Sequence, residues 1–549
     1  MVVILFHNYL TKIRSLFLSC WFIFVSAIGI IPPLLKPGFP PNHEDETFVL
    51  RTMVYAKHFR FADFIPVWAS SDNYGMGSPL PSLYHRLFYF VSGLIYAITD
   101  HAKISIASTL IVFTSLGVYF VFVLLRSFQC SKQVAMLGAS TLPFLNYSVT
   151  NWLVRGAMAE YSAMMLIPLV LYIVKKSWDR KLLHAKIGFV FGFLFLAHSV
   201  VAYFVAIILA FVLIAAILLR LLPAKFFAPK QVVLSLCAFG AVTWWSLLPM
   251  LYFRQRFDVR RLLPDFLNVQ FQFRHISDYV WDSAWSWSNP PQLFTVQLDV
   301  ILVLGCAVLL LMRRYSKELF AMFAILAVSL LLQNGRSWRV YNIIPEAEFI
   351  QFPWRLSAIS SVMFLILVFA GLRNARTFAI VVAVLTILIS GTWQRVNYYS
   401  YPDRLETQNS RSLSNYSISL FGEYLPADGP LLAPDPASNA VFSEWKLTID
   451  EFVQTANSNA QCTLNRNTPI HESRRVTFTA TCEESSLVTI PIFATSAHSV
   501  VASRPGVDNA CIVSQSSQSL CVIRLPEGIT DVTVHMPTFI GVLKSLLRF

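Results

Sequence analysis

Charged side chains are scarce in this sequence. Asp, Glu, Lys and Arg make up 13% of its 549 residues, whereas about 25% is usual in a soluble domain. Hydrophobic residues make up 56%, including 45 Phe and 13 Trp. This balance excludes an ordinary soluble domain and predicts a polytopic membrane protein. The formal charge of +13 does not indicate a nucleic-acid partner, because Lys and Arg also gather in the cytoplasmic loops of membrane proteins.

Motifs of familiar soluble enzymes are missing as well. The sequence has no Walker loop, HExxH, GxSxG or Rossmann fingerprint in a suitable context, and no CxxC pair that predicts zinc. Several acids could hold a divalent metal, but no spacing implies one, and we predict no cofactor. Of eight cysteines, four lie in the polar C-terminal region. Their proximity predicts the disulfides Cys462–Cys482 and Cys511–Cys521, one of the three pairings that four cysteines allow.

Long apolar runs, by contrast, are abundant. A membrane-spanning helix needs about 20 apolar residues, and eleven runs approach that length. They are 15–35, 104–125, 133–149, 157–174, 182–197, 199–219, 231–251, 294–312, 317–332, 354–372 and 376–393. A twelfth run, 83–98, is shorter and has His85 and Arg86 in its first turn.

Basic residues decide whether run 83–98 crosses the membrane. If it does not cross, six basic segments fall on one side. These are Lys12/Arg14, Arg126/Lys132, Lys175–Lys186, Arg220–Lys230, Arg313–Lys317 and Arg373/Arg376. If it crosses, all but the first move outside, against the positive-inside rule. We therefore predict eleven spans, an interfacial helix at 83–98 and a cytoplasmic N-terminus. Residues 1–35 lack a small-x-small cleavage site before Pro32–Pro33, which predicts a retained first span.

Composition changes after residue 394. Residues 395–549 are rich in Ser, Thr, Asn and Pro, with short alternating or apolar runs such as Val476–Ala480 between turn signals such as Arg504–Pro505–Gly506. This pattern predicts an extracytoplasmic β domain, a small sandwich, after a mainly α membrane domain over 1–394. The last residues, 537–549, are too short to span and are expected on the membrane surface.

The outer loop 36–86 concentrates residues that a bilayer excludes. Glu44, Asp45 and Glu46 are consecutive, directly after the first apolar run. Three acids exceed what a helix cap requires, and a carboxylate there suits a general base. The alternative interpretation is that Asn42 caps a helix and the acids complement its dipole.

Basic residues follow these acids. Arg51 and Lys57 lie five and eleven positions beyond Glu46, so a continuous helix carries positive charge away from the acids. That separation suits a carboxylate facing an acceptor and a cation facing a phosphate, and a solvated helix face explains it equally well.

Two further motifs place charge where apolar runs begin. Arg155 and Glu160 bracket the start of run 157–174, either as a mutual pair or as part of a functional site. Trp354 and Arg355 open a later run, a position also typical of an interface belt.

The outer loop 252–293 is rich in arginine and tryptophan. Its residues of these types include Arg254, Arg256, Arg260, Arg261, Arg274, Trp281, Trp285 and Trp287. So much positive charge outside opposes the bias of the other loops. It predicts a phosphate ligand at the outer leaflet, with tryptophan faces for sugar rings.

These motifs, in this order, resemble the GT-C superfamily of membrane glycosyltransferases, and within it the YfhO-like proteins, some described as 6-pyruvoyl-tetrahydropterin-synthase-related membrane proteins. The resemblance rests on several short motifs spread over nearly the whole chain. They are His43–Glu44–Asp45 with Arg51, the Phe64–Trp68 run, Gly75–Pro79, Arg155–Glu160, Gln351–Arg355 and Glu423–Pro426.

The resemblance implies sugar transfer on the outer face of a bacterial inner membrane, from a polyprenyl-phosphate sugar to a lipid, glycan or protein acceptor. Asp45 is the expected base, with Glu44 and Glu46 as alternatives, and inversion at the anomeric carbon follows. Donor-phosphate ligands are expected among the outer-face cations. These are Arg51, Lys57, Arg155, Arg355 and Arg260, supported by His43, Trp68, Glu160 and Trp354. A transporter or flippase of lipid-linked glycans, or a non-catalytic assembly factor, is the alternative.

Overall fold

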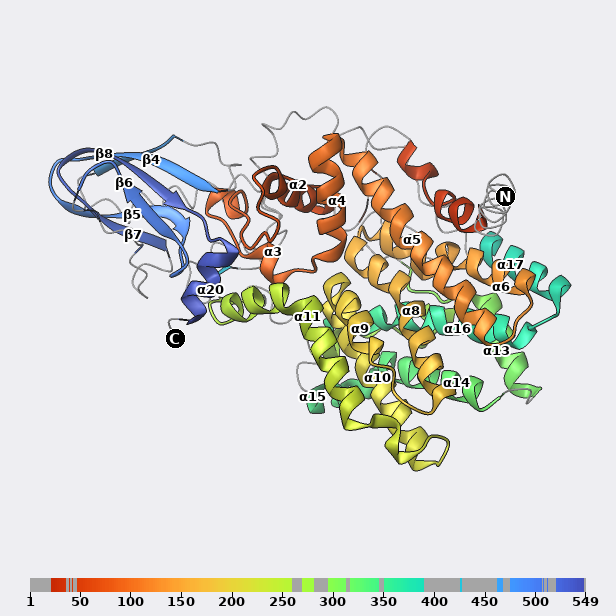
Figure 1. Cartoon of the computed structure of the whole chain (residues 1–549). Coiled ribbons are helices and arrows are strands. Elements are labelled where there is room, and N and C mark those ends of the chain that lie inside the picture. The colour runs from red at the N-terminus through yellow and green to blue at the C-terminus, as the bar shows by residue number, and fades with distance from the viewer. Residues whose placement is uncertain are drawn as a thin grey trace, which may run out of the picture. The chain divides into compact units, whose positions relative to one another are not determined.

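The computed structural model of this protein is mainly helical, with a small β region near its C-terminus (Figure 1). It describes residues 21–35, 39, 42, 47–258, 269–280, 295–312, 316–344, 350–389, 425–426, 462–467, 474–505, 507, 511 and 520–547. The chain divides into two compact units. The first unit comprises 1–48, 103–243 and 268–403, and the second comprises 49–102, 244–267 and 404–549.

Five described segments are long and apolar enough to cross a membrane. They are α5 (Ala102–Ser127), α8 (Met158–Arg180), α10 (Ser199–Leu218), α11 (Pro229–Arg254) and Pro353–Leu372, which joins the 3₁₀ turn η9 (Pro353–Leu356) to α16 (Ser357–Leu372). A sixth combines α14 (Lys317–Gln333) with Gly335–Ile343 across an 83° bend. An integral membrane protein is therefore supported, whereas the predicted eleven spans are not confirmed.

Several predicted spans correspond to shorter helices. These are α6 (Lys132–Thr141), α9 (Lys186–Ala197), α13 (Val300–Leu311) and α17 (Arg376–Ile389). Run 83–98, which was predicted not to cross, corresponds to α4 (Leu87–Thr99). The 13 residues of α4 extend about 20 Å at 1.5 Å per residue, less than the roughly 30 Å hydrocarbon core. This length suits the interfacial helix predicted over 83–98.

Run 133–149 is interrupted for a local reason. α6 ends at Thr141, and the turn η3 (Leu142–Phe144) carries Pro143. Proline has no N–H to donate to the preceding turn, so it breaks a helix. The chain resumes as α7 (Asn146–Val149), directly followed by a π-helical segment, Thr150–Val154.

The described part of the second unit contains a short antiparallel pair, β1 (Phe257–Asp258) with β2 (Leu425–Pro426), and two larger antiparallel sheets. One has the strand order β3–β4–β8–β6, and the other pairs β5 with β7. The strands are β3 (Cys462–Arg466), β4 (Arg475–Cys482), β5 (Ser486–Phe493), β6 (Ser499–Ala502), β7 (Leu520–Leu525) and β8 (Gly528–His535). Inward side chains of both sheets, such as Phe478 and Ile490, belong to one buried cluster, as in the predicted sandwich.

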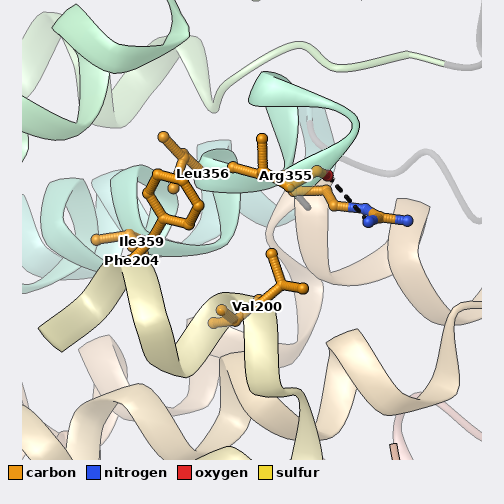
Figure 2. Close-up of a pocket in the computed structure, with 7 residues that line it drawn as sticks. Val200, Phe204, Arg355, Leu356 and Ile359 are labelled. Carbon is orange, nitrogen blue, oxygen red and sulfur yellow. Dashed lines mark hydrogen bonds between the residues drawn. The ribbon is translucent and has the colours of Figure 1, made fainter. Parts of the chain in front are cut away.

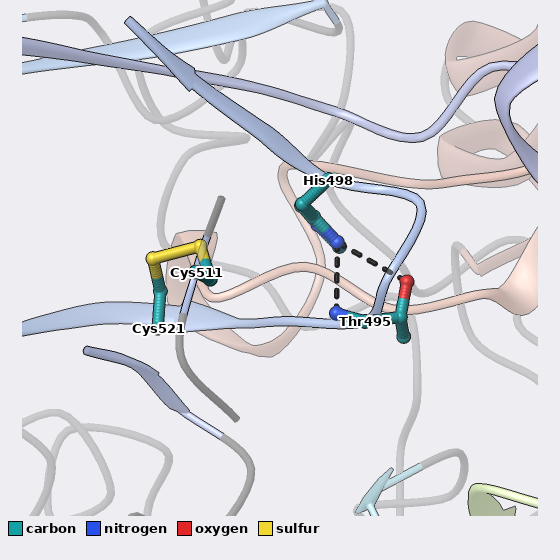
Figure 3. Close-up of a disulfide and its surroundings, with 4 residues drawn as sticks. All are labelled: Thr495, His498, Cys511 and Cys521. Atoms are coloured by element: carbon teal, nitrogen blue, oxygen red, sulfur yellow. Dashed lines mark hydrogen bonds between the residues drawn. A yellow bond between two sulfur atoms is a disulfide. The ribbon is translucent and has the colours of Figure 1, made fainter. Parts of the chain in front are cut away.

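Both disulfides that sequence spacing predicts are present. Cys462 and Cys482 lie opposite each other in the β3–β4 ladder and are bonded. Cys511 is bonded to Cys521 on β7 (Figure 3). Both bonds close short loops and add to the hydrophobic packing of the β sandwich.

Helix α2 (Thr47–Arg60) and helix α4 of the same unit pack closely. A Cβ at Gly93 would lie 2.5 Å from the Cβ of Tyr55, so glycine permits the contact. Thr52 and Ser92 hydroxyls hydrogen-bond at 2.9 Å across the same interface. The segment between α2 and α4 contacts the β sandwich of the same unit. There the Phe493 N–H of β5 donates to the Met76 carbonyl at 3.0 Å.

His498 is buried beside this loop, and we expect it to make stability depend on pH. Its Nδ1 accepts a hydrogen bond from the Thr495 N–H at 3.0 Å (Figure 3), and its ring packs edge-on against Trp68. Burial lowers the pKa of His498 to about 3, against about 6.5 in an unfolded chain. Below pH 6.5 the unfolded state therefore binds a proton that the folded state excludes.

The stabilising contribution of neutral His498 is complete above about pH 6.5 and is lost as the pH falls toward 3. At pH 5 the expected loss in the free energy of unfolding is about 2 kcal/mol. Urea unfolding of the full chain, followed by circular dichroism, measures it. His498→Asn keeps an acceptor near Nδ1 and should remove this part of the dependence; equal pH dependence in both proteins would contradict the prediction.

The orientation of α11 gives a direct test of topology. Lys230 lies at one end of this helix, and Val501 is 55% exposed on β6. With Cys20 and Cys237 replaced by serine, Val501→Cys should react with an impermeant thiol reagent added outside. Lys230→Cys should react only after permeabilisation. The reverse pattern would contradict a cytoplasmic N-terminus and an outer β domain.

Candidate functional site

Glu160 is the centre of a buried polar cluster in the first unit. Its side chain is 1% exposed, and its Oε2 lies 3.0 Å from Arg155 Nη1 and 3.5 Å from Arg355 Nε. The Tyr147 hydroxyl donates to Oε1 at 2.6 Å. Two guanidinium groups from distant parts of the sequence therefore converge on one carboxylate.

Arg155 occupies an irregular part of the backbone. It ends the π-helical segment Thr150–Val154, and its guanidinium also donates to Asn151 Oδ1. Gly156 follows with φ of 72°, and a Cβ there would lie 2.4 Å from Asn42 Oδ1. Both the left-handed backbone and the close contact require glycine. Single π-helical turns are frequent at functional sites, where they redirect side chains.

Glu160 and Arg355 lie at the starts of helical segments. Glu160 is in the first turn of α8, where the helix dipole favours a carboxylate. Arg355 lies in η9, directly before α16. Its Nη1 donates to the Ile350 carbonyl at 3.0 Å and to Gln351 Oε1 at 3.2 Å. These bonds hold the guanidinium over its own turn and toward Glu160.

Aromatic rings cover both guanidinium groups. Arg155 Cζ lies 4.5 Å from the ring centroid of Trp354, and Arg355 Cζ lies 4.9 Å from that of Phe352. The two rings stack with centroids 5.1 Å apart. Cations are attracted to ring faces. The Gln351–Arg355 run therefore supplies the guanidinium of Arg355 and also the two rings that orient the guanidinium groups of Arg155 and Arg355.

Arg355 also lines a small cavity of about 10 Å³, which is room for about one water molecule. The other lining residues are all apolar: Val200, Val201, Phe204, Ile350, Leu356 and Ile359. Figure 2 shows the Arg355 guanidinium extending beyond these apolar side chains. The cavity is too small to hold a hydrocarbon chain, and its lining is an apolar surface that ends at a cation. Such a surface suits contact with an amphiphilic anion.

Buried polar side chains fix the helices around this pocket. His198 Nδ1 accepts from the Val201 N–H at 3.2 Å and caps α10. Gln333 accepts from Ser357 Oγ at 2.9 Å and donates to Ser360 Oγ at 2.8 Å. Gln333 thereby joins the end of α14 to the start of α16, next to Arg355.

The predicted residues Arg51, Lys57 and Trp68 lie in the second unit. Arg51 is 5% exposed and lies 4.1 Å above the Tyr84 ring. Burial, with a contribution from the charge of Arg60, lowers the pKa of Lys57 to about 8. Trp68 is fully buried in the core that includes strand residues.

The candidate phosphate ligands thus divide between the units. Arg155 and Arg355 meet in the first, whereas Arg51 and Lys57 belong to the second. The remaining predicted residues lie outside the described residues: His43, Glu44, Asp45, Glu46 and Arg260. Within the described ranges, no group of three or more His, Cys, Asp or Glu side chains is placed to hold a metal ion.

Tyr147 and Asn151, which contact the Glu160–Arg155 pair, were not predicted as site residues. A series of polar side chains in and just after apolar run 133–149 could have indicated them. Also not predicted as a site residue was Arg86, which is 1% exposed and lies 5.2 Å from the Trp245 ring. Its Nη1 donates to the Pro66 carbonyl at 3.3 Å.

No protein-family model matches the chain, and no curated protein matches it. A functional assignment therefore depends on these residues and their contacts.

Proposed function

We propose that this protein transfers a sugar from a polyprenyl-phosphate donor to a lipid, glycan or protein acceptor at the outer face of the membrane. The observation that carries the proposal is the convergence of Arg155 and Arg355 on Glu160, with Arg355 also lining an apolar pocket. A polyprenyl phosphate has the matching parts, a hydrocarbon chain and an anionic head.

The arginines would stabilise the leaving group. When the acceptor hydroxyl attacks the anomeric carbon, the bond from that carbon to the phosphate oxygen breaks. The electron pair leaves with the phosphate, whose negative charge increases. Guanidinium groups held in place by Glu160 and by the rings of Phe352 and Trp354 need little reorganisation to meet that charge.

A carboxylate of the first outer loop would accept the proton of the acceptor hydroxyl. Asp45 is the preferred base, with Glu44 or Glu46 as alternatives. A carboxylate can accept a hydroxyl proton as the oxygen bonds to carbon. One displacement of this kind inverts the anomeric configuration. Arg51 and Lys57 belong to the second unit, and their role as donor ligands stays a prediction from the sequence.

Loss of the Arg355 charge is expected to weaken donor binding. Hydrogen bonds to charged groups contribute about 1.5–3 kcal/mol, so Arg355→Gln should reduce affinity for a polyprenyl monophosphate by about 10- to 150-fold. Titration calorimetry of the protein in nanodiscs measures this change. Exposed Arg336 supplies the matched control, and Arg336→Gln should leave affinity within about twofold.

The uncharged polyprenol separates recognition of the head from partitioning of the chain. Wild-type protein should bind the monophosphate far more tightly than the alcohol. Equal affinity for both compounds, or an Arg355→Gln protein with wild-type affinity, would contradict a phosphate site at Arg355.

A further inference from the structure

The C-terminal helix α20 (Phe539–Leu547) carries apolar residues both on its buried face and on its exposed face. One face is buried, through Phe539, Val542 and Ser545. The opposite face leaves Ile540 65% exposed and Leu547 86% exposed. Nine residues extend about 14 Å, too short to cross a bilayer.

Helix α20 is firmly attached to the second unit. Thr538 Oγ1 accepts from the Gly541 N–H at 3.1 Å at the start of the helix. Ser545 Oγ donates to the Ser496 carbonyl at 3.4 Å, and Ser496 Oγ hydrogen-bonds the Tyr252 hydroxyl at 2.8 Å. Tyr252 belongs to the C-terminal half of α11. The helix therefore has a fixed orientation relative to the end of a candidate membrane span.

A direct ring contact extends this connection. Phe539 of α20 and Trp244 of α11 pack with ring centroids 5.5 Å apart, and Figure 1 shows α20 beside the C-terminal part of α11. Trp244 is itself 47% exposed, and Leu251 is 52% exposed on the same helix. Exposed apolar side chains therefore occur both on α20 and on α11, the helix that Phe539 of its buried face contacts, and α11 is long enough to span a membrane.

Both helices also carry an exposed basic residue. Lys544 is exposed on α20, and Arg254 is exposed at the end of α11. Apolar side chains beside Lys or Arg are typical of helices that lie at the boundary between headgroups and acyl chains, where cations meet anionic lipid phosphates. Tryptophan is also enriched at this depth.

We propose that α20 lies in the membrane interface, with Ile540 and Leu547 against lipid acyl chains and Lys544 among anionic headgroups. The β sandwich is then held at the bilayer at a second place, besides its covalent connections to membrane helices. The proposed sugar transfer is not needed for this inference, which concerns only how the second unit meets lipid.

Site-specific fluorescence tests the proposal on the full chain. Leu547→Cys and Ile540→Cys are prepared with Cys20 and Cys237 replaced by serine and labelled with an environment-sensitive nitrobenzoxadiazole probe. The proteins are reconstituted in vesicles of phosphatidylcholine and phosphatidylglycerol. Val501→Cys, on a similarly exposed apolar position of β6, is the matched control.

Both α20 probes should emit at shorter wavelength than the Val501 probe and lose most of their emission to a lipid nitroxide placed high on the acyl chain. Omitting phosphatidylglycerol should reduce that quenching. Probes on α20 that behave like the Val501 probe would overturn the proposal. Probes shielded from water but unquenched by the lipid nitroxide would also overturn it, because they would indicate a protein partner or a second copy of the chain.

Discussion

Sugar transfer by the Asp45→Asn protein is expected to be slower by about 10²–10⁴-fold, the usual contribution of general acid–base catalysis. Asparagine keeps the size of the side chain and most of its hydrogen bonding but cannot accept the acceptor's proton. Donor binding, which we propose to depend on the arginines, should be unchanged. Release of polyprenyl monophosphate, measured beside calorimetric binding of the donor, separates the two effects.

Asp45 has neighbours that supply matched controls. Glu44→Gln and Glu46→Gln remove the same charge one position away and should leave most of the activity. If the acids only complement a helix dipole, each substitution costs roughly 0.3–1 kcal/mol of stability with near-normal activity. Full activity in a protein with all three acids replaced would contradict a base in this loop.

Glu160→Gln is expected to lower the free energy of unfolding by about 3–5 kcal/mol, because removing one partner of a buried ion pair leaves uncompensated charge. Here the charge belongs to Arg155 and Arg355, whose ion pairs with Glu160 would both be lost. Glutamine matches the volume of the carboxylate and still accepts from the Tyr147 hydroxyl. Glu483→Gln, at an exposed turn, should change stability by less than about 0.5 kcal/mol.

A double variant separates the ion pair from the packing of these side chains. In the double variant Glu160→Gln, Arg155→Met, one of the two arginine charges left without a carboxylate is removed. The double variant should therefore lose less free energy of unfolding than the sum of the losses of the two single variants, since residues in one network are coupled. Denaturant titration in detergent gives the three values. Strict additivity, or a Glu160→Gln protein as stable as wild type, would contradict a coupled buried cluster.

The pairing of Arg155 with Glu160 could be predicted from sequence because both lie in one short motif next to an apolar run. The ion pair of Arg355 with Glu160 could not be predicted from the sequence. This contact depends on how α8 and the Pro353–Leu372 segment pack, and local sequence does not encode that packing. Both motifs were nevertheless identifiable, because ionisable residues at helix ends in a membrane protein are usually paired or functional.

The β strands and both disulfides followed from alternation and cysteine spacing. The association of Trp68 and Met76 with the β core did not, because the residues concerned are separated by hundreds of positions. A sequence pattern identifies Trp68 as an aromatic in a motif, but only the packing identifies it as a core residue. Helix length was overestimated where Pro143 interrupts apolar run 133–149.

The most direct test of the proposed function uses the purified protein in vesicles with a panel of synthetic polyprenyl-phosphate sugars and a membrane extract as acceptor. Mass spectrometry follows the donor, and a side-specific probe reports which leaflet holds it. We predict release of polyprenyl monophosphate together with a glycosylated acceptor of inverted anomeric configuration, and loss of both products in Asp45→Asn. Intact donor moved to the opposite leaflet, with no monophosphate released, would contradict sugar transfer and indicate a transporter.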